Sequence, residues 1–587
     1  MYQETFVLDE NLSPIEANKI IAAGAHYKNC SACLMQVYEP SCDPDFISDR
    51  MRIQRETLPK ANIVGMTTLG PIGPETKVPS DPMITLVYFE NSGFDTYLFD
   101  CHDIDPREAG RQLCDKLAKT EHVQGVLLLT ACAMIVPTPV IEELESRYPH
   151  ISVFGAQAGT KELGNDQSMV FTSHEICDRG ILAVVFYGED LHIKTDYNLG
   201  WRPIGREMTV TGMGEDGYVN SIDYEAAIDV YRRYLDVEPD EAFYSNVCAF
   251  PLLTRSGNRL IARVPTHFSP DGAMRFPAML SEGSKVSLSY TKPEYLLRNS
   301  LASANEMATF APQAIMLFAC INRRVYMGND HADQEFDYYR RICPELSYAY
   351  GYGEILRTPE GGELLNSTIV AAGFREGSTP EGYQVEPYID PDLSEDGPKF
   401  KSLADRLATC LEATTADLNQ TIEDLEQLVN LDQLTGLYNR RWIDEEIEQR
   451  LGKRRRRTDQ GFAVLMYDID HFKNINDTFG HETGDAVLQE LSRRVKAMMR
   501  SDDVVGRWGG EEFLVIANSI SLEDATKLAE RIRESIASTP FSAVGTVTIS
   551  FGVAESQEDD SPASLFSRVD GALYEAKESG RNRVVAH

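Results

Sequence analysis

The feature that most constrains the fold of this chain is a pair of glycines followed by a pair of glutamates, set between apolar runs. This motif is Gly509-Gly510-Glu511-Glu512. It lies between Val504-Val505, a few residues before it, and the run Phe-Leu-Val-Ile directly after it. This pattern predicts a β-hairpin whose glycines supply the positive φ angles of a primed turn. Glycine lets a ligand approach the backbone closely, and carboxylates at such a tip suit a hard cation held over a phosphate.

A second acidic motif lies upstream of this turn. The apolar run over 462–467 predicts a buried strand, and Asp468 falls at its carboxyl end, where α/β sheets bind ligands. A carboxylate there, beside the hairpin carboxylates, suits Mg²⁺, which uses few protein ligands and completes its shell with substrate phosphates. A polar loop punctuated by glycines follows and leads into a predicted helix that carries Val487 and Leu491.

Two cations lie near the end of the sequence. Lys577 and Arg581 are four residues apart, and Gly580 directly precedes the arginine. Helical spacing predicts that both side chains lie on one face, where they suit a phosphate group.

Residues 431–587 resemble the GGDEF family, the diguanylate cyclases. Four separated motifs occur in the family's order: Asp432-x-Leu434-Thr435-Gly436-Leu437, Asp468-Ile469-Asp470 through Gly484-Asp485, Gly509-Gly510-Glu511-Glu512-Phe513, and Ala576-Lys577-x-x-x-Gly580-Arg581-Asn582. The resemblance implies a nucleotidyl-cyclase (palm-like) domain, in which helices flank a sheet with antiparallel strands. It also implies that two GTP molecules are condensed into cyclic di-GMP with release of two pyrophosphates.

The same resemblance implies roles for individual residues. Asp468, the carbonyl of Ile469 and Glu511 are expected to hold Mg²⁺, with Mn²⁺ as an alternative, and Glu512 adds a catalytic carboxylate. The residues expected to bind substrate are Lys473, Asn476, Asp485, Gly509, Gly510, Lys577 and Arg581. The three cations would neutralise the triphosphate, while Asn476 and Asp485 would read the guanine edge.

Arg500 and Asp503 match the family's R-x-x-D product-inhibition site in sequence and in distance from the glycine turn. An arginine grips a phosphate or a guanine edge bidentately, and an aspartate accepts from guanine N1–H, so the pair suits cyclic di-GMP. Arg531, on a helix predicted over 522–536, is expected to add a guanidinium from a neighbouring domain. A surface salt bridge at a helix end is the alternative interpretation.

The segment up to about residue 376 predicts a mixed α/β domain, because β-rich and helical runs alternate. The clearest expected strands are 83–89, 125–130 and 180–187, and the clearest helices are 106–119 and 139–148. Residues 212–217 spell G-x-G-x-x-G, but a return strand rather than a helix follows them. We therefore predict a hairpin turn there and no dinucleotide site.

Residues 1–240 and 241–376 resemble the N- and C-terminal halves of the FIST sensory module. The motifs that carry the resemblance include Gly155-Ala156-Gln157-Ala158-Gly159, Gly200-Trp201-Arg202-Pro203, Ser281-Glu282-Gly283, Leu317-Phe318-Ala319-Cys320 and Gly351-Tyr352-Gly353-Glu354. The resemblance implies a sensor for a small molecule, which the sequence does not identify.

Residues 377–430 are expected to join the sensor to the cyclase domain at 431–587. Pro, Gly and acidic residues over 377–399 predict a linker. Steps of four and three residues then form a heptad seam through Phe400, Ala404, Leu407, Leu411, Thr414, Leu418, Thr421, Leu425 and Leu428. The seam favours a parallel coiled coil that forms a homodimer, and a single packed helix is the alternative.

Composition excludes several classes of protein. A length of 587 residues predicts three or four domains. The formal net charge of −35 argues against a protein that wraps nucleic acid, and no P-loop motif is present. The N-terminus is no signal peptide and the longest apolar run is too short to span a bilayer, so we expect a cytoplasmic protein.

Three further features have a bland and a functional interpretation. Cys30 and Cys33 are expected to be reduced, buried and structural rather than part of a metal or redox site. The basic residues 453–457 predict a solvated loop, with a partner contact as the alternative. For the whole chain, the alternative to an enzyme is a non-catalytic receptor for GTP or cyclic di-GMP, or a scaffold.

Overall fold

The chain forms two compact units, Met1–Thr415 and Ala416–His587, which are described separately. The computed structural model describes all residues except 9–11, 69–81, 132–134, 161–166, 241–242, 258, 277–279, 359–360, 394–409, 412, 419, 422–428, 456–460, 501 and 558. Within these described ranges no helix has both the length and the apolar character needed to cross a membrane.

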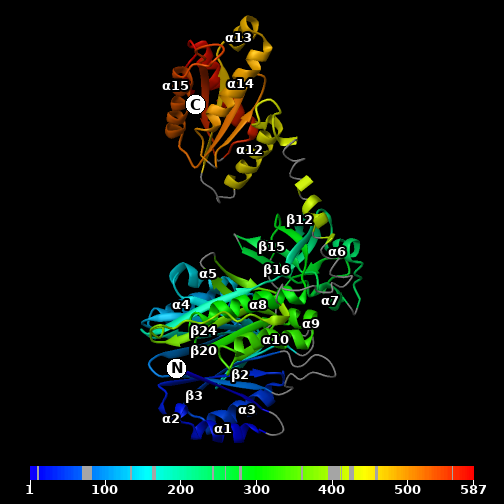
Figure 1. Cartoon of the computed structure of the whole chain (residues 1–587), viewed down its shortest axis with the longest axis vertical. Coiled ribbons are helices and arrows are strands. Elements are labelled where there is room, and N and C mark those ends of the chain that lie inside the picture. Colours follow the sequence, from blue (N-terminus) through cyan, green and yellow to red (C-terminus); the bar gives the residue numbers. More distant parts are fainter. Residues whose placement is uncertain are drawn as a thin grey trace. The chain divides into compact units, whose positions relative to one another are not determined.

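The N-terminal unit begins with a six-stranded sheet covered by helices on one face (Figure 1). The strand order is β1 (Tyr2–Val7), β4 (Met83–Phe89), β2 (Ala32–Glu39), β3 (Ala61–Thr67), β8 (Val170–Thr172) and β9 (Ile176–Cys177). The helices are α1 (Pro14–Ala23), α2 (Ala25–Asn29) and α3 (Pro44–Thr57). Capping fixes the starts of α1 and α3: Ser13 forms a capping box with Glu16, and the Asp43 side chain accepts from the amides of Asp45 and Phe46.

Two further sheets lie against the inner face of the first. One has the order β23 (Gly361–Leu365), β22 (Gly353–Thr358), β7 (Ser152–Gln157), β6 (Val123–Thr130), β10 (Gly180–Tyr187) and β5 (Gly93–Asp100), with α4 (Pro106–Leu117) and α5 (Thr138–Arg147) outside. The other has the order β11 (Leu191–Asn198), β24 (Ile369–Glu376), β20 (Ala314–Cys320) and β21 (Ser347–Gly351). Its outer helices are α8 (Pro293–Ala308), α9 (Ile321–Met327) and α10 (Asn329–Arg340).

Alternation along the strands explains this layering. In β6, Leu127 and Leu129 face the inner core shared by the sheets, whereas Val126 and Leu128 face α4 and α5. A strand buried on both faces is apolar at nearly every position, as β6 is. The result is an inner core enclosed by three sheets, each with helices on its outer face.

A fourth sheet completes the N-terminal unit. It contains β16 (Arg259–Arg263), β15 (Leu252–Ser256), β19 (Lys285–Tyr290), β12 (Arg202–Met213), β13 (Tyr218–Ile222), β18 (Met274–Arg275), β17 (His267–Phe268) and β14 (Glu225–Ala226), with α6 (Ala227–Leu235) and α7 (Phe243–Val247). β12 and β13 pair antiparallel through the short 3-10 turn Glu215–Gly217, so the predicted hairpin is confirmed. Three of the four sheets combine strands from before and after residue 240.

The segment after β24 is more ordered than a free linker. Tyr383 donates to the carbonyl of Ala308 at the end of α8, and Tyr388 exchanges two hydrogen bonds with Asn305 on the same helix. Tyr338 of α10 donates to Asp390. The hydroxyl of Tyr383, the backbone of Tyr388 and the carboxylate of Asp390 make these contacts, so the predicted linker is packed on α8 and α10 as far as Leu393, which ends the 3-10 turn η2 (Pro391–Leu393).

Part of the predicted heptad seam lies outside the described residues. Of the nine positions, Leu411, Thr414, Leu418 and Thr421 are described, and all four are helical and exposed. Leu411 is 47% exposed and Leu418 is 48% exposed. The coiled coil stays a prediction.

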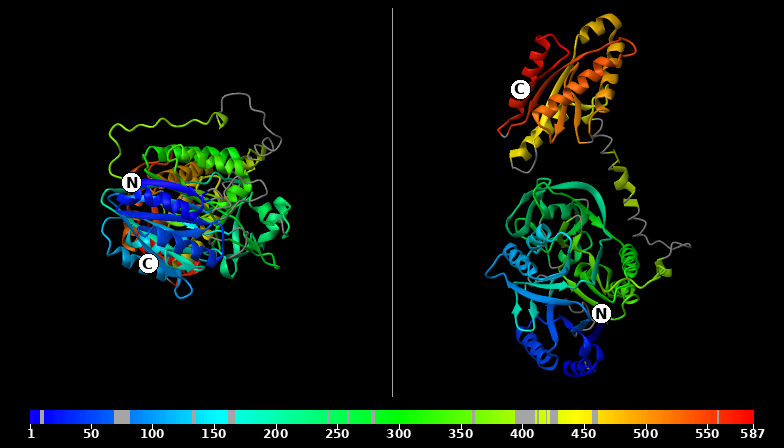
Figure 2. Two further views of the ribbon diagram at one scale, coloured as in Figure 1. Left: turned by 90° about the horizontal axis from the view of Figure 1, so that it is seen from below. Right: turned by 90° about the vertical axis from the view of Figure 1, so that its left-hand side faces the viewer.

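The C-terminal unit is one six-stranded sheet between two layers of helices (Figure 2). Its order is β25 (Tyr438–Asn439), β27 (Val504–Arg507), β28 (Glu512–Asn518), β26 (Phe462–Ile469), β29 (Ile549–Glu555) and β30 (Val584–Ala586). The central pairs are antiparallel and the two edge pairs parallel. One face carries α13 (Phe472–Phe479), α14 (His481–Lys496) and α15 (Leu522–Ser538), and the other α12 (Arg440–Arg455) and α16 (Pro562–Glu578).

This architecture confirms the predicted fold class of mixed α/β and α+β units with a sheet flanked by helices. The strands expected over 83–89 and 180–187 are β4 and β10, and the expected helices over 106–119 and 139–148 differ from α4 and α5 by one or two residues at an end. One local prediction is wrong: residues 453–455 belong to α12, which ends at Arg455, rather than to a loop.

We predict that Glu354 makes the stability of the N-terminal unit depend on pH. This carboxyl group is fully buried in β22; Thr368 donates to one oxygen through its amide and hydroxyl, and the other oxygen has no partner within the described residues. Burial raises its pKa to about 8 from an ordinary 4.5. The folded state therefore keeps a proton that the unfolded state has released, and stability falls as pH rises through this window.

Glu354→Gln removes that titration while keeping the shape of the side chain. Its unfolding temperature should match that of wild type at about pH 5 and exceed it at about pH 8. Thermal unfolding at both pH values tests this, with the exposed Glu381→Gln as control. The prediction would be contradicted if the unfolding temperatures of Glu354→Gln and wild type differed by the same amount at both pH values.

Candidate functional site

Three carboxylates and a lysine meet at one end of the central strand of the C-terminal unit. Asp468, the penultimate residue of β26, lies directly opposite Glu512 of β28. The amide of Ile469 donates to the carbonyl of Glu511 at 3.4 Å, which joins the strand end to the hairpin tip. Lys577 of α16 reaches the same point, with its Nζ 2.8 Å from Oδ2 of Asp468.

Strand alternation explains why these side chains share a face. Leu465 and Tyr467 of β26 belong to the core under α14 and α15, whereas Val464 and Met466 belong to the core under α16. Asp468 continues the second series, so it lies on the α16 side, where Lys577 contacts it.

The negative charges in this cluster disfavour their own ionisation. The pKa of Asp468 is raised to about 6, chiefly by burial; the charges of Glu511 and Glu512 contribute to this rise, and Lys577 opposes it. Burial likewise raises the pKa of Glu511, with Glu512 adding to the effect and Lys577 opposing it. Carboxylates held together in this way favour binding of a cation.

The donor set fits Mg²⁺. Asp468 and Glu511 offer carboxylate oxygens, and the carbonyl of Ile469 lies at the same strand end. Hard oxygen donors with few protein ligands are the preference of this ion. Mn²⁺ accepts the same donors.

The hairpin tip differs from the predicted primed turn. Amides of Trp508 and Gly509 both donate to the carbonyl of Glu512, at 2.8 and 3.1 Å. Neither Gly509 nor Gly510 has a positive φ, so that prediction is wrong. A loop longer than two residues does not need primed geometry. The glycines instead leave space: a Cβ at Gly509 would lie 2.9 Å from a carboxylate oxygen of Glu512, and one at Gly510 would meet nothing within 4 Å.

Arg507 holds the tip in place. Its guanidinium donates to the carbonyls of Gly509 and Gly510, at 3.1 and 2.7 Å, and pairs with Asp432 at 3.2 Å. Burial raises the pKa of Asp432, but hydrogen bonds from Thr435 and the charge of Arg507 outweigh it, so the pKa lies below its ordinary value. Asp432 is therefore a charged anchor between the start of the unit and the hairpin.

Arg581 does not share a helical face with Lys577. Helix α16 ends at Glu578, and Arg581 lies in the following loop with a φ of 63°. The expected helical spacing fails because Gly580, with a φ of 114°, follows the helix end and turns the chain. Asp470, 6% exposed, holds this loop by accepting from the amide of Asn582 at 3.0 Å.

The predicted guanine-reading residues lie on a helix pair. The carbonyl oxygen of the Asn476 side chain on α13 sits over Gly484 of α14, where a Cβ would lie only 1.9 Å away. Asp485 is the next residue on α14 and is exposed, as is Lys473 on the first turn of α13. The structure thus places Asn476 against Gly484, the residue before Asp485.

The R-x-x-D residues form a local turn before β27. The amide of Arg500 donates to Asp503 at 3.1 Å, and the other oxygen of Asp503 accepts from the amide of Asn518 at 3.2 Å. Arg500 and, on α15, Arg531 are exposed. Over the described part of the chain, no ion pair joins the guanidinium of Arg500 to Asp503. The predicted alternative, a salt bridge between these two side chains, is thus not formed.

Three residues that hold the site together received no role from the sequence. Asp432 lies in the first motif and Arg507 lies two residues before the glycine pair, but nothing in their spacing shows that they pair. Asp470 was visible too; its role emerges only because Thr548, Ser550 and Asn582, distant in sequence, donate to it.

The cysteines within the described ranges are all free thiols. Cys33 is buried, as predicted, whereas Cys30 is only half-buried, and the structural role of the two stays a prediction. Asp100, His102 and Cys177 lie within 4.8 Å of one another, with His102 hydrogen-bonded to Asp100 at 2.8 Å on an exposed edge. Such an exposed pair is common without a metal.

Comparisons with known proteins find three domain families that match successive parts of the chain. The family described as "Diguanylate cyclase, GGDEF domain" matches residues 429–583. The FIST N domain matches residues 33–225, and the FIST C domain matches residues 227–357.

Among similar proteins, diguanylate cyclase DgcM of Escherichia coli K12 is 37% identical over 251 residues, covering 42% of this chain and 55% of that protein. The response regulator PleD of Caulobacter vibrioides is 43% identical over 174 residues, covering 29% of this chain and 38% of the relative. The chain therefore spans about half the length, or less, of these two relatives.

A solved structure of the coiled coil and GGDEF domain of DgcB from Caulobacter crescentus, in complex with c-di-GMP, is 31% identical. It covers 32% of this chain and 100% of that chain, with a TM-score of 0.30. Taken with the acid cluster and the layered sheets, the family matches assign the parts of the molecule: the chain carries FIST N and FIST C domains followed by a GGDEF domain of the diguanylate cyclase family.

Proposed function

We propose that this protein is a diguanylate cyclase that condenses two GTP molecules into cyclic di-GMP and two pyrophosphates. The observation that carries the proposal is the meeting of Asp468, Glu511 and Glu512 with Lys577 at the end of β26. The names of the similar proteins support the same reaction.

In this proposal each group at the cluster has a separate task. Asp468, the carbonyl of Ile469 and Glu511 hold Mg²⁺, which when bound stabilises the charge that develops at the α-phosphate. Lys577, now paired with Asp468, exchanges this partner for a phosphate oxygen, and Lys473 and Arg581 add positive charge. Asn476 and Asp485 orient the guanine, because a carboxylate accepts from N1–H and the 2-amino group.

The reaction needs two catalytic domains that face each other, since each binds one GTP. We propose that the helix with Leu411 and Leu418 pairs with a second copy and supplies the high effective concentration. The exposed leucines of this helix support pairing. The FIST unit is proposed to bind a small molecule and thereby to regulate the cyclase.

The direct test is to incubate the full chain with GTP and Mg²⁺ and to measure cyclic di-GMP by mass spectrometry. Formation of cyclic di-GMP that EDTA abolishes supports the enzyme. Binding of GTP or cyclic di-GMP without turnover would instead support a receptor. The absence of both binding and turnover would support a scaffold.

Glu511→Gln should lower turnover on the order of a hundredfold or more, because it removes a charged oxygen donor while keeping shape. The circular dichroism spectrum should be unchanged, since Glu511 is only half-buried. Glu523→Gln, at an exposed position on α15, is the matched control and should retain activity. A nearly normal rate for Glu511→Gln would contradict the metal assignment.

Leu411→Asp with Leu418→Asp should abolish dimer formation, because two charges would enter the proposed apolar seam. The specific rate at dilute concentration should fall and should recover as protein concentration rises. Light scattering and initial rates measure the two effects. Ala416→Asp, off the seam on the same helix, is the control, and a double variant that is still dimeric would refute the seam.

Arg500→Ala should let more product accumulate before the rate falls, with the initial rate little changed, because a guanidinium that grips cyclic di-GMP is lost. Complete progress curves at several added product concentrations measure this. Arg493→Ala removes an exposed arginine of α14 that is paired with Glu490, and serves as control. If Arg500→Ala and wild type show one inhibition curve, the R-x-x-D pair does not bind product.

A further inference from the structure

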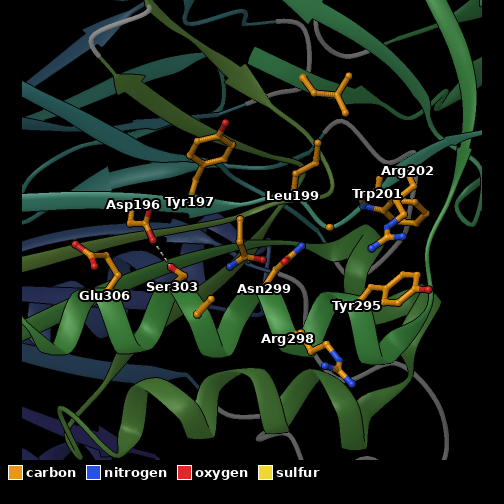
Figure 3. Close-up of a pocket in the computed structure, with 14 residues that line it drawn as sticks. Asp196, Tyr197, Leu199, Trp201, Arg202, Tyr295, Arg298, Asn299, Ser303 and Glu306 are labelled. Atoms are coloured by element: carbon orange, nitrogen blue, oxygen red, sulfur yellow. Dashed lines mark hydrogen bonds between the residues drawn. The ribbon is translucent and has the colours of Figure 1, made fainter. Parts of the chain in front are cut away.

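The N-terminal unit contains a pocket with a volume of about 620 Å³. Its walls are the end of β11 with the residues up to Arg202, and one face of α8; Leu260 of β16 also lines it (Figure 3). A volume of this size is typical of small-molecule sites.

The pocket runs along α8. Arg298, Asn299, Ala302, Ser303 and Glu306 all line it, at spacings that place them on one face of a helix. With a rise of 1.5 Å per residue, the backbone between Arg298 and Glu306 extends about 12 Å. The lining along α8 therefore covers more than two turns of the helix, with the small side chain of Ala302 midway.

One end of the pocket is cationic. Arg298 lies there with Arg202, whose guanidinium stacks over the ring of Tyr295 at 4.1 Å. Figure 3 shows Arg202 beside Tyr295, away from Asp196 and Glu306, with Arg298 one turn further along α8. A planar guanidinium supported by an aromatic face is well suited to a carboxylate.

The other end is acidic. Asp196 accepts a hydrogen bond from Ser303 at 2.5 Å, and Glu306 pairs with Lys194 at 2.6 Å. Lys194 balances only one of the two carboxylates, so one negative charge remains in excess at this end.

The wall between the two ends holds an unused hydrogen-bond donor. Asn198 lines the pocket and is only 6% exposed. Its carbonyl oxygen accepts from Ser300 at 3.3 Å, but its amide nitrogen has no partner within the described residues. An unpaired buried donor is unfavourable, and a carbonyl group of a ligand can satisfy it.

We propose that this pocket binds a linear zwitterion whose two charges lie about 10 Å apart, of which a tripeptide is the simplest example, because three extended residues span that length. The ammonium group lies near Asp196 and Glu306, the carboxylate near Arg202 and Arg298, and a central peptide carbonyl accepts from Asn198. A single α-amino acid carries both charges on one carbon and reaches only one end of the pocket.

The inference rests on the proposed sensory role of the FIST unit, but its test does not depend on the cyclase. Isothermal titration calorimetry of the full chain with triglycine should show one site per chain. N-acetyl-triglycine, triglycine amide and glycine should each bind at least about tenfold more weakly, because each loses a charge-assisted contact.

Matched variants locate the two charges. Arg298→Gln should weaken triglycine but bind triglycine amide as wild type does, since the lost partner is then already absent. Asp196→Asn should weaken triglycine but leave N-acetyl-triglycine unaffected for the same reason. Arg111→Gln, an exposed arginine of α4 outside the pocket, is the control and should bind triglycine normally.

The proposal would be overturned if triglycine did not bind, or if triglycine and glycine bound with equal affinity. It would also be overturned if Arg111→Gln weakened triglycine binding as much as the pocket variants do. If triglycine binds with the predicted pattern but the rate of cyclic di-GMP formation is unchanged, the binding site stands and the sensory role fails. If the protein makes no cyclic di-GMP at all, calorimetry still decides the proposal.

Discussion

The C-terminal unit depends on the burial of one strand. Every residue of β26 from Phe462 to Ile469 is buried, with strands paired on both sides and helices on both faces. A slip of one residue would exchange the two faces and turn Asp468 toward the core under α14 and α15. The apolar pattern of the strand therefore also fixes where the carboxylate stands, so packing and chemistry are not independent here.

Much of this unit could be predicted from the sequence, because its strongest signals are local. The apolar run before Asp468 and the valines flanking the glycine turn identify β26, β27 and β28. The details that failed are set by loop length and helix ends. The hairpin tip has more residues than a primed turn, and α16 stops at Glu578, before Arg581. Pairing of Arg507 with Asp432 joins residues far apart in sequence and has no local signal.

The N-terminal unit was less predictable for the same reason. Its strands were recognisable, but three of its sheets interleave the two halves of the sequence. The pocket shares this property: Asp196 and Arg202 come from one half, and Arg298 with Glu306 from the other. Only the folded chain shows that the two pairs of charges face a common space.

Helix α8 takes part in two sets of contacts. One face lines the pocket, and beyond it Asn305 and the carbonyl of Ala308 hold Tyr388 and Tyr383. Those tyrosines lie on the stretch of chain that leads toward the C-terminal unit. Displacement of α8 by a ligand in the pocket would therefore also displace the segment that carries Tyr383 and Tyr388, because one helix makes both sets of contacts.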